Sequence, residues 1–491
     1  MKDLHDLEIV LGSTLPLLIV QTSEERRALD LFRRLTYTET RPMYVWSATE
    51  GMTTINGDVP ARKDLVDPEA LLRHVKAVKQ GGIYILLDFH PFIDNPILLR
   101  LVREIAQAAW VNHHLVMVSP KLDTPPDLKL LTARFELSLP NRETIYEIIK
   151  STAEEYRKRY PARKVKADRK ALDGMINQLI GLSTPDVKRL IHNAIFHDGA
   201  ITASDLSEIA KAKYDLINSG EVLSFEYDTS RFEEVGGFRA LKRWLSHRKD
   251  IFLTGKAPPG LDPPKGLMLL GVQGGGKSLA AKAVAGAWNV PLLRLDFGTL
   301  FNKYIGESER NLRVALKTAN LMAPCVLWID EIEKGLADSG DDAGPSRRML
   351  GTLLTWMAER ERPVFLVATA NDISRLPPEL IRKGRLDEIF FVDLPAADVR
   401  AQIFGIHLDK RKVARQGFDF GKLAASSDGF TGAEIEQAVV SALYAAHAQS
   451  KPLDQDILTH ELENTRPLSV VMAEQVAELR AWAASRTVPA D

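Results

Sequence analysis

The sequence predicts an α/β protein built on parallel sheets, and it predicts this plan twice in one chain. From about residue 223 onward, short apolar runs bounded by turn residues alternate with helical patterns, as is typical of a parallel sheet covered by helices. The first half shows the same alternation more faintly. The length of 491 residues supports the reading, because one hydrophobic core rarely grows to that size and several packing units are expected.

Five apolar runs give the predicted strands of the second half. They cover residues 266–270, 292–295, 326–329, 364–368 and 389–392. After Leu394-Pro395 the pattern turns helical to the end, including the stretch 472–484. This change of period predicts an α/β domain over 223–395 and a helical lid over 396–491.

The first half has predicted strands at 15–20, 82–88 and 114–119. They indicate an α/β domain over 1–140 that is followed by a helical subdomain over 141–222. Linker-like segments at 219–222 and 227–230 separate the two halves.

Two further segments of the first half have counterparts in the second. Residues 135–140 parallel 391–395, and residues 181–187 parallel 429–435. Because the order of the pieces is preserved, we expect an internal repeat, although chance similarity between amphipathic segments also explains the match.

Composition excludes several classes of protein. Lys and Arg number 64 against 65 acids, so the net charge of −1 gives no bulk attraction to nucleic acid or to an anionic membrane. The longest apolar runs fall far below the ~20 residues of a membrane helix. The N-terminus lacks a signal-peptide pattern, and the single cysteine rules out a disulfide framework within one chain. We expect a cytoplasmic protein without a membrane segment.

One glycine-rich loop carries the strongest chemical signal. Gly271-Val272-Gln273-Gly274-Gly275-Gly276-Lys277-Ser278 fits the pattern G-x-x-x-x-G-K-[ST], follows a predicted strand and opens a helix at Leu279. Glycines let the backbone N–H groups wrap around phosphates, and the helix N-terminus adds its positive end. Lys277 is expected to reach the terminal phosphates, and the Ser278 hydroxyl to ligate magnesium. The loop therefore predicts ATP and Mg²⁺ as ligands.

Polar residues end two more strands of the second half. Asp330 and Glu331 follow 326–329, and acids at this edge of an α/β sheet lie at the ligand crevice. Asp330 is expected to hold magnesium through water, and Glu331 to polarise the attacking water. If the pair is considered by itself, two acids that only cap the following helix are an equally good interpretation. Asn371 ends a further strand, and in the usual sheet order it would lie beside the γ-phosphate.

In order and spacing these motifs closely resemble the AAA ATPase family, from Arg231-Phe232-Glu233-Glu234-Val235-Gly236-Gly237 through Gly432-Ala433-Glu434. The resemblance implies a P-loop NTPase AAA module with a helical lid, in which Asn371 is sensor 1. It also implies the residues around the adenine and ribose, which are Val235, Gly236, Gly237, His407, Gly432 and Ala433.

The same resemblance implies an arginine finger at Arg385, in Ile381-Arg382-Lys383-Gly384-Arg385, which reaches the nucleotide of a neighbouring subunit. A solvated loop arginine is the alternative, since one chain cannot prove an action on another. Related proteins often carry a second arginine three residues further on, where this chain has Glu388. The partner implied is a second copy of the chain, in a homo-oligomer expected to be a hexamer.

Lys303-Tyr304-Ile305-Gly306 resembles the family's first pore loop, whose aromatic residue grips a translocating polypeptide. A tyrosine that only tethers the loop is the alternative. The stretch 337–345 is placed like the second pore loop.

The first half lacks the chemistry of the second. Gln21-Thr22-Ser23-Glu24-Glu25-Arg26 follows its first strand without a glycine-rich loop, and Asp88 is followed by Phe89-His90 with no water-activating acid. We expect this domain not to bind ATP. A degenerate AAA-like domain before an active one resembles AAA proteins of unassigned role from algal plastid genomes and cyanobacteria, so the plastid stroma is an alternative location.

Two weaker signals give little support to a nucleic-acid surface or a metal site. Eight Lys or Arg against one acid in 157–170 could meet nucleic acid, but a solvated helix and loop is the simpler reading. His113-His114 has no nearby Cys or carboxylate cluster that would suggest a metal site.

The sequence thus predicts an ATP-hydrolysing ring that remodels or threads a protein. Two alternatives stay open, namely a regulatory or scaffold ATPase that only switches with nucleotide state, and a nucleic-acid-associated motor.

Overall fold

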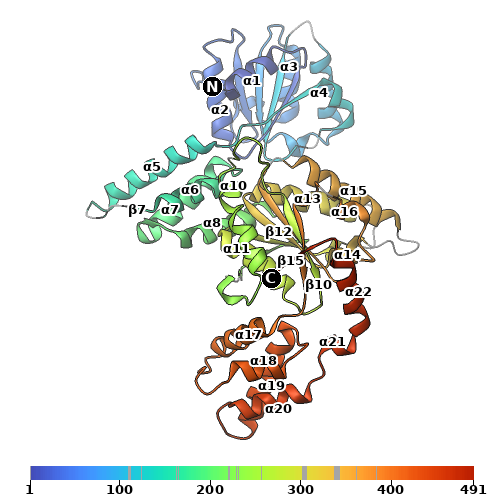
Figure 1. Cartoon of the computed structure of the whole chain (residues 1–491). Helices are drawn as coiled ribbons and strands as arrows, with labels where there is room; N and C mark the ends of the chain where they lie inside the picture. Colours follow the sequence, from blue (N-terminus) through green and yellow to red (C-terminus); the bar gives the residue numbers. More distant parts are fainter. Residues whose placement is uncertain are drawn as a thin grey trace. The chain divides into compact units, whose positions relative to one another are not determined.

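The computed structural model describes residues 2–108, 112–122, 124–161, 163, 165–218, 222–227, 229, 232–255, 257–300, 307–336, 343–360, 362–382 and 384–491 (Figure 1). The chain forms two compact units. Unit 1 comprises Met1–Ile149 and Leu182–Arg189, and unit 2 comprises Lys150–Gly181 and Leu190–Asp491.

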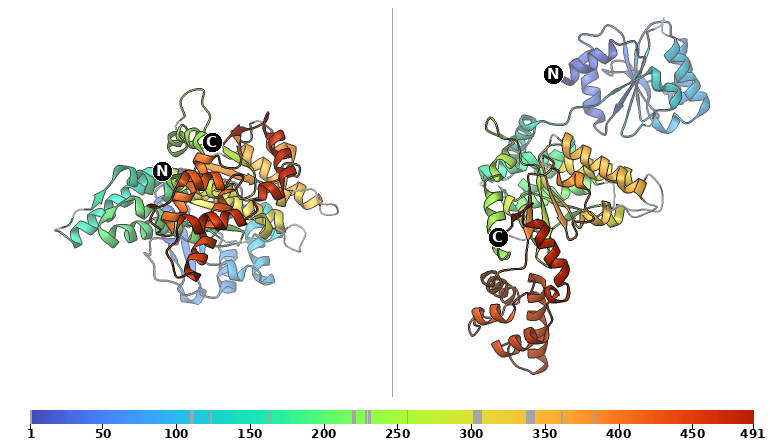
Figure 2. Two further views of the ribbon diagram at one scale, coloured as in Figure 1. Left: turned by 60° about the horizontal axis from the view of Figure 1, so that its bottom comes forward. Right: turned by 45° about the vertical axis from the view of Figure 1, so that its right-hand side comes forward.

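Unit 1 is a sheet with helices on both faces, as the right-hand view of Figure 2 shows. Its strands are β1 Leu17–Gln21, β2 Met43–Ser47, β3 Gly51–Thr54, β4 Ile83–Leu87, β5 His114–Ser119 and β6 Thr132–Phe135. Its helices are α1 Lys2–Leu11, α2 Glu25–Leu35, α3 Pro68–Ala77 and α4 Pro96–Gln107. The sheet order is β3-β2-β4-β5-β1-β6, and every pair is parallel except β2 with β3.

Alternation along the strands explains why both faces of this sheet are covered. Leu17 and Ile19 of β1 pack into the core under α3 and α4, whereas Leu18 and Val20 pack into the core under α1 and α2. Successive residues of a strand point to opposite faces, so an unbroken apolar strand needs helices on both sides.

From residue 142 to residue 217 the chain is mostly helical. The elements are α5 Arg142–Arg159, β7 Lys166–Ala167, α6 Arg169–Leu179, α7 Thr184–Asp198, β8 Ala200–Ile201 and α8 Ala203–Ile217. Strands β7 and β8 pair with each other in parallel.

The large sheet of unit 2 has the order β15-β14-β10-β13-β12-β11-β9. Its strands are β9 Leu223–Glu226, β10 Gly266–Gly271, β11 Leu292–Leu295, β12 Cys325–Ile329, β13 Val364–Ala370, β14 Glu388–Val392 and β15 Val488–Pro489. Its helices are α9 Arg239–Ser246, α10 Lys249–Thr254, α11 Lys277–Trp288, α12 Phe297–Leu300, α13 Glu307–Met322, α14 Ile332–Leu336, α15 Ala343–Glu359 and α16 Pro378–Ile381. Helices α9 to α11 share a core with one face, and α8, α13 and α15 with the other.

A separate small core holds the C-terminal helices together. These are α17 Ala397–Lys410, α18 Phe420–Ser426, α19 Gly432–Ala448 and α20 Gln455–Asn464, followed by α21 Leu468–Val471 and α22 Ala473–Ala483. The helical lid and the late helix predicted from sequence are therefore present.

The two sheets share one strand order. Strands β2-β4-β5-β1-β6 of the first sheet correspond one by one to β11-β12-β13-β10-β14 of the second. In the first sheet β1 lies between β5 and β6, and in the second its counterpart β10 lies between β13 and β14. The turns before α7 and α19 match as well, because Gly181 and Gly429 both have positive φ, at 93° and 79°. These shared features support the internal repeat.

Strands β2, β3 and β6 of unit 1 were not predicted from the sequence, and two short strands of unit 2 correct the interpretation further. Residues 223–226, between the two linker-like segments, form β9, which pairs antiparallel with β11. The C-terminal end is not helical throughout, because β15 pairs with β14 and the Arg239 guanidinium holds the Asp491 carboxylate at 2.6 Å. A two-residue strand that contains a proline has no periodicity to detect. No helix within the described ranges is long and apolar enough to cross a membrane.

Candidate nucleotide-binding site

The glycine-rich loop joins β10 to α11 at the middle of the large sheet. Gly274 and Gly276 have φ of 78° and 93°, a region that side chains with a Cβ rarely adopt. A Cβ on Gly271 would lie 2.0 Å from the Val392 carbonyl oxygen of β14, so only glycine fits there. Helix α11 begins at Lys277, and its N-terminus therefore faces the loop, as an anion site requires.

Lys277 is buried inside this loop. Its Nζ donates to the carbonyl oxygens of Gly271 and Val272, both at 2.8 Å. Burial lowers the pKa of Lys277 to about 8, against the opposing effect of three nearby carboxylates, so the ammonium remains largely charged at pH 7. Gln273, Ser278 and Leu279 are exposed at the loop surface.

The two residues predicted to hold magnesium lie together. Ser278 Oγ is 3.4 Å from Asp330 Oδ1, and that same oxygen accepts a 2.7 Å hydrogen bond from Thr369 Oγ1. A hydroxyl and a carboxylate are the hard oxygen ligands that Mg²⁺ prefers alongside phosphate oxygens. The other oxygen, Asp330 Oδ2, lies 3.3 Å from Nη2 of Arg294, whose guanidinium carbon is 4.9 Å from the Trp328 ring centre.

Glu331 and Asn371 also meet. They follow the neighbouring strands β12 and β13, and Asn371 Nδ2 donates to Glu331 Oε1 at 2.8 Å. Glu331 has a φ of 48°, and its backbone N–H donates to Thr369 Oγ1 at 3.0 Å. Its other carboxylate oxygen, Oε2, lies 2.5 Å from Lys334 Nζ.

Sequence reasoning missed four residues of this cluster, namely Arg294, Thr369, Glu333 and Lys334. Glu333 is only 3% exposed, and its Oε1 accepts the backbone N–H of Asn371 at 2.9 Å. Burial raises the pKa of Glu333. The sequence offered one signal, a second acid two residues after Glu331, but a surface acid on the following helix looks the same in a sequence.

Two of the glycines expected around the adenine lie close to helix α17 of the lid. A Cβ on Gly236 would lie 3.0 Å from Ile403 Cγ1 of α17, and one on Gly432 would lie 3.7 Å from Ile403 Cδ1. The backbone N–H of Ala433 donates to the Gly274 carbonyl at 3.3 Å, which joins the lid to the phosphate loop.

Val235 is buried, and a Cβ on Gly237 would lie 3.0 Å from Val399 Cγ1 of α17. His407 lies one turn beyond Ile403 on α17. Its ring lies within the lid, with Nδ1 3.3 Å from Arg411 Nη1 and 3.6 Å from Glu436 Oε1, and burial lowers the pKa of His407.

Arg385 lies at the opposite end of the strands from the phosphate loop. Strand β14 pairs in parallel with β10, with Glu388 opposite Leu267 and Val392 opposite Gly271. Asp387 Oδ2 fixes the loop before β14 by accepting the Gly266 backbone N–H at 2.9 Å. Along β10, the four residue steps from Leu267 to Gly271 span about 13 Å, and this length separates the start of β14 from the phosphate loop. Arg385 is half-buried, and its Nη1 has no hydrogen-bond partner within the described part of the chain.

Glu388, which stands at the second-finger position, begins β14 and accepts the backbone N–H of Ile389 with its own carboxylate at 3.2 Å. The predicted first pore loop, Lys303 to Gly306, lies outside the described residues, and so do 337–342 of the second.

Unit 1 has a different turn where unit 2 has its phosphate loop. Strand β1 ends at Gln21 and α2 begins at Glu25, so only Thr22-Ser23-Glu24 joins them, without a glycine. Thr22 Oγ1 accepts the backbone N–H of Glu24 at 2.9 Å, which closes the turn tightly.

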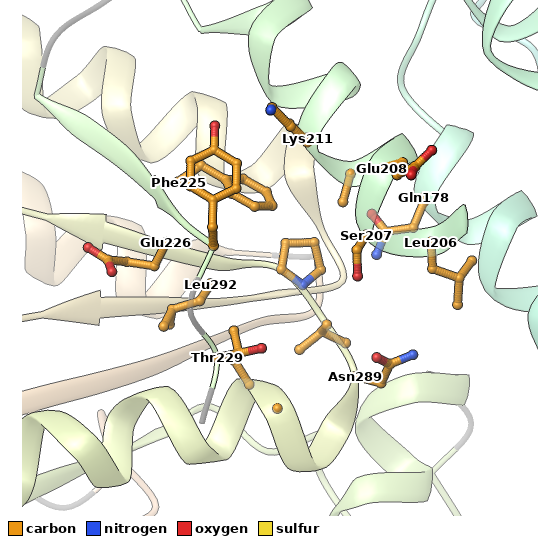
Figure 3. Close-up of a pocket in the computed structure, with 16 residues that line it drawn as sticks. Gln178, Leu206, Ser207, Glu208, Lys211, Phe225, Glu226, Thr229, Asn289 and Leu292 are labelled. Atoms are coloured by element: carbon orange, nitrogen blue, oxygen red, sulfur yellow. The ribbon is translucent and has the colours of Figure 1, made fainter. Parts of the chain in front are cut away.

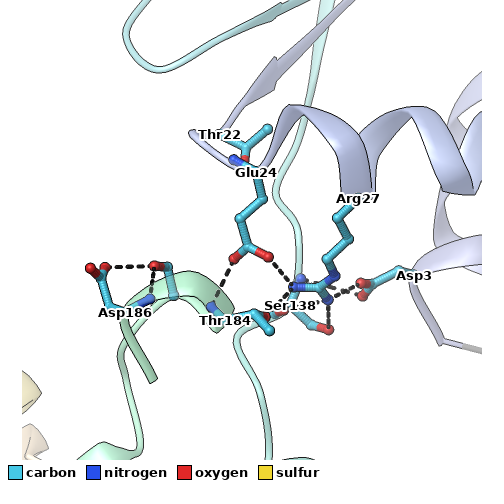
Figure 4. A network of polar contacts seen from close by, with 8 residues as sticks. Asp3, Thr22, Glu24, Arg27, Ser138, Thr184 and Asp186 are labelled. Carbon is cyan, nitrogen blue, oxygen red and sulfur yellow. Dashed lines mark hydrogen bonds and ion pairs between the residues drawn. The ribbon is translucent and has the colours of Figure 1, made fainter. Parts of the chain in front are cut away.

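The carboxylate of Glu24 occupies this turn (Figure 4). It accepts the backbone N–H of Thr184 at 3.1 Å and lies 3.4 Å from Arg27 Nη1. Arg27 in turn donates to Asp3 at 2.9 Å and to the Ser138 carbonyl at 2.7 Å. An acid already held at the start of α2 would repel a phosphate at the same place.

We therefore predict that the full-length protein binds one ATP per chain. Isothermal titration should give a stoichiometry near one for wild type and no binding for Lys277→Ala, because the described turn between β1 and α2 of unit 1 is not a glycine-rich loop that could retain the nucleotide. ATP binding by Lys277→Ala would place a second nucleotide site in the first half.

Unit 2 also contains a cavity of about 440 Å³ away from the phosphate loop (Figure 3). Helix α8 lines it with Ser207 and Lys211, strand β9 with Phe225, and the end of α11 with Asn289. None of the residues 271–278 lines it. The cavity is therefore distinct from the nucleotide site.

Three family models match separate segments of the chain. Residues 267–394 match the family model of the ATPase family associated with various cellular activities (AAA). Residues 3–137 match the N-terminal domain, and residues 143–220 the second domain, of SpoVK-like AAA ATPases.

Relatives match over the full length. The uncharacterized AAA domain-containing protein ycf46 of Pyropia yezoensis is 34% identical over 488 residues, which cover 98% of this chain and 97% of the relative. That of Trieres chinensis is 32% identical over 99% of this chain and 97% of its own length. The proteasome-activating nucleotidase of Aeropyrum pernix is 34% identical over 55% of this chain and 69% of its own.

Proposed function

Because this chain belongs to the AAA ATPase family, together with the full-length ycf46 relatives, we propose that it hydrolyses ATP in a ring and uses the cycle to remodel a protein. The observation that carries this proposal is the set of polar residues at the ends of β10, β12 and β13. Lys277 is bonded within the phosphate loop, Ser278 lies 3.4 Å from Asp330, and Asn371 donates to Glu331.

Binding of ATP falls to the phosphate loop and the lid. Lys277 would exchange its two carbonyl partners for the β- and γ-phosphates, which offer stronger, charge-assisted hydrogen bonds. Ser278 and Asp330 would hold magnesium, which neutralises phosphate charge when bound. The segment 235–237 and the start of α19 would enclose the base and ribose, because both pack against Ile403 beside the loop.

Glu331 and Asn371 are the residues proposed to carry out hydrolysis. The carboxylate of Glu331 would accept a proton from the attacking water, and the Asn371 amide would hold the carboxylate and the water in line with the γ-phosphate. Their 2.8 Å hydrogen bond supports this division, since an amide already aimed at the base needs little reorganisation.

Arg385 would act on a neighbouring subunit. Its position at the far end of β10 from its own phosphate loop supports action in trans. An arginine from the next subunit would stabilise the charge that develops on the γ-phosphoryl group. This requirement for a neighbour supports an oligomer, which we propose to be a hexameric ring of identical chains.

The substrate is proposed to be a protein gripped by Tyr304. The similarity to a proteasome-activating nucleotidase supports a partner that is itself a protein machine or its client. A Glu331→Gln variant should hold ATP without turning it over, and a ring kept in that state should retain its substrate.

We predict that Tyr304→Ala lowers the amount of protein captured by the Glu331→Gln ring, because the aromatic contact is lost while ATP binding is not. Cross-linked pull-downs of Glu331→Gln with and without Tyr304→Ala measure this. Tyr444→Ala is the matched control, since Tyr444 is an exposed tyrosine on the lid helix α19. Equal capture by all three proteins would favour an ATPase that only switches with nucleotide state.

A further inference from the structure

The water-activating carboxylate is engaged at both of its oxygens. Glu331 Oε1 accepts from Asn371 Nδ2 at 2.8 Å, and Glu331 Oε2 lies 2.5 Å from Lys334 Nζ. The first contact comes from the neighbouring strand, and the second comes from one turn further along the chain, on α14. Base and lysine are three residues apart, the spacing at which side chains on a helix meet.

We propose that Lys334 restrains the catalytic base, so that hydrolysis is faster once its ammonium leaves Glu331. This inference rests on the proposed role of Glu331. Each carboxylate oxygen can accept two hydrogen bonds, so the two contacts do not close the base, but an ammonium at Oε2 competes with the attacking water for that oxygen and stabilises the carboxylate against taking up a proton. The base therefore accepts a proton more readily after the lysine contact opens.

The lysine is the contact more easily broken. Its side chain is 66% exposed, whereas that of Glu331 is 34% exposed, so water can replace the ammonium. Asn371, in contrast, is anchored through its backbone N–H, which donates to the buried Glu333. The hydrogen bond to Glu331 raises the pKa of Lys334, and the lysine therefore stays charged across the physiological range.

The size of the effect follows from the exposure of the pair. Ion pairs of this kind contribute little, so releasing the base should raise the basal ATPase rate about two- to fivefold and no more. The exposure of the pair also makes it sensitive to ionic strength. Added salt should weaken the contact and raise the basal rate of wild type modestly, and it should not raise the rate of a protein without the lysine.

The test compares Lys334→Met with Lys334→Arg, which keeps the cation and should behave as wild type. Lys76→Met is the matched control, because it removes an exposed lysine–glutamate pair, with Glu104, in unit 1. Basal kcat, its dependence on salt and the Kd for ATP are measured on the full-length protein. We expect a higher kcat for Lys334→Met that no longer rises with salt, with an unchanged Kd.

A kcat for Lys334→Met that stays equal to wild type, or falls below it while Kd is unchanged, overturns the restraint, since the lysine would then be neutral or would orient the base productively. Glu331→Gln separates this failure from a failure of the proposed function. If Glu331→Gln is inactive and Lys334→Met is not accelerated, only the restraint is wrong. If Glu331→Gln still turns over normally, Glu331 is not the base.

Discussion

Lys277→Ala is expected to abolish ATP binding, whereas Glu331→Gln keeps binding and stops turnover. Lys277 supplies the only ammonium inside the phosphate loop, where its Nζ bonds Gly271 and Val272. Its loss removes charge-assisted contacts to the phosphates. Glu331 follows β12, which β13 separates from β10, and in the proposed mechanism it acts only on the attacking water. The amide variant should therefore lose about 10²-fold or more in kcat.

Calorimetry with ATP and a phosphate-release assay on both variants separate binding from turnover. Lys334→Arg serves as a control for changes near the base, because it preserves the ion pair. If Glu331→Gln hydrolyses ATP at the rate of wild type, the base has been assigned wrongly, although the phosphate loop would stand.

Arg385→Ala is expected to lower kcat by about 10³-fold while leaving ATP affinity intact, because an arginine finger stabilises charge only in the transition state. Arg382→Ala offers a matched control, since Arg382 is an exposed arginine in the same loop. The rate per subunit of wild type should also rise with protein concentration, because dilution removes the neighbour that donates Arg385. A large loss of ATP affinity in Arg385→Ala would instead indicate that the residue supports its own site.

Much of the fold could be predicted because apolar strands and turn residues form patterns within short stretches of sequence. The central strands of both sheets fell within one or two residues of the observed β1, β4, β5 and β10 to β14, and the glycine-rich loop marked the phosphate site directly. Strands β9 and β15 could not be found in this way. Each is short and is held by a partner far away in the sequence, β11 for the first and β14 for the second.

The candidate site could be predicted where a residue stands at the end of a buried strand, as Asp330, Glu331 and Asn371 do. Residues that act through those three were missed. Thr369 bridges Asp330 and the Glu331 backbone, Glu333 holds the Asn371 backbone, and each contact joins strand β13 to the end of β12. Such contacts depend on which strands are neighbours, and the sequence does not state sheet order.

The same limit applies to Arg385. The sequence pointed to this arginine through resemblance alone, whereas the register of β14 against β10 places it at the edge remote from its own phosphate loop. The division of the chain at 140, 222 and 395 stays a proposal, to be tested by limited proteolysis.

One measurement tests the shared active site most directly. Arg385→Ala subunits have an intact phosphate loop and no finger, and Lys277→Ala subunits have the finger and no working loop. Mixed rings contain interfaces that pair an intact loop with an intact finger, so ATPase activity should return in the mixture although each protein alone is nearly inactive. If co-assembly is verified and the mixture stays as inactive as its components, Arg385 does not act in trans, and the account of a ring with shared sites is contradicted.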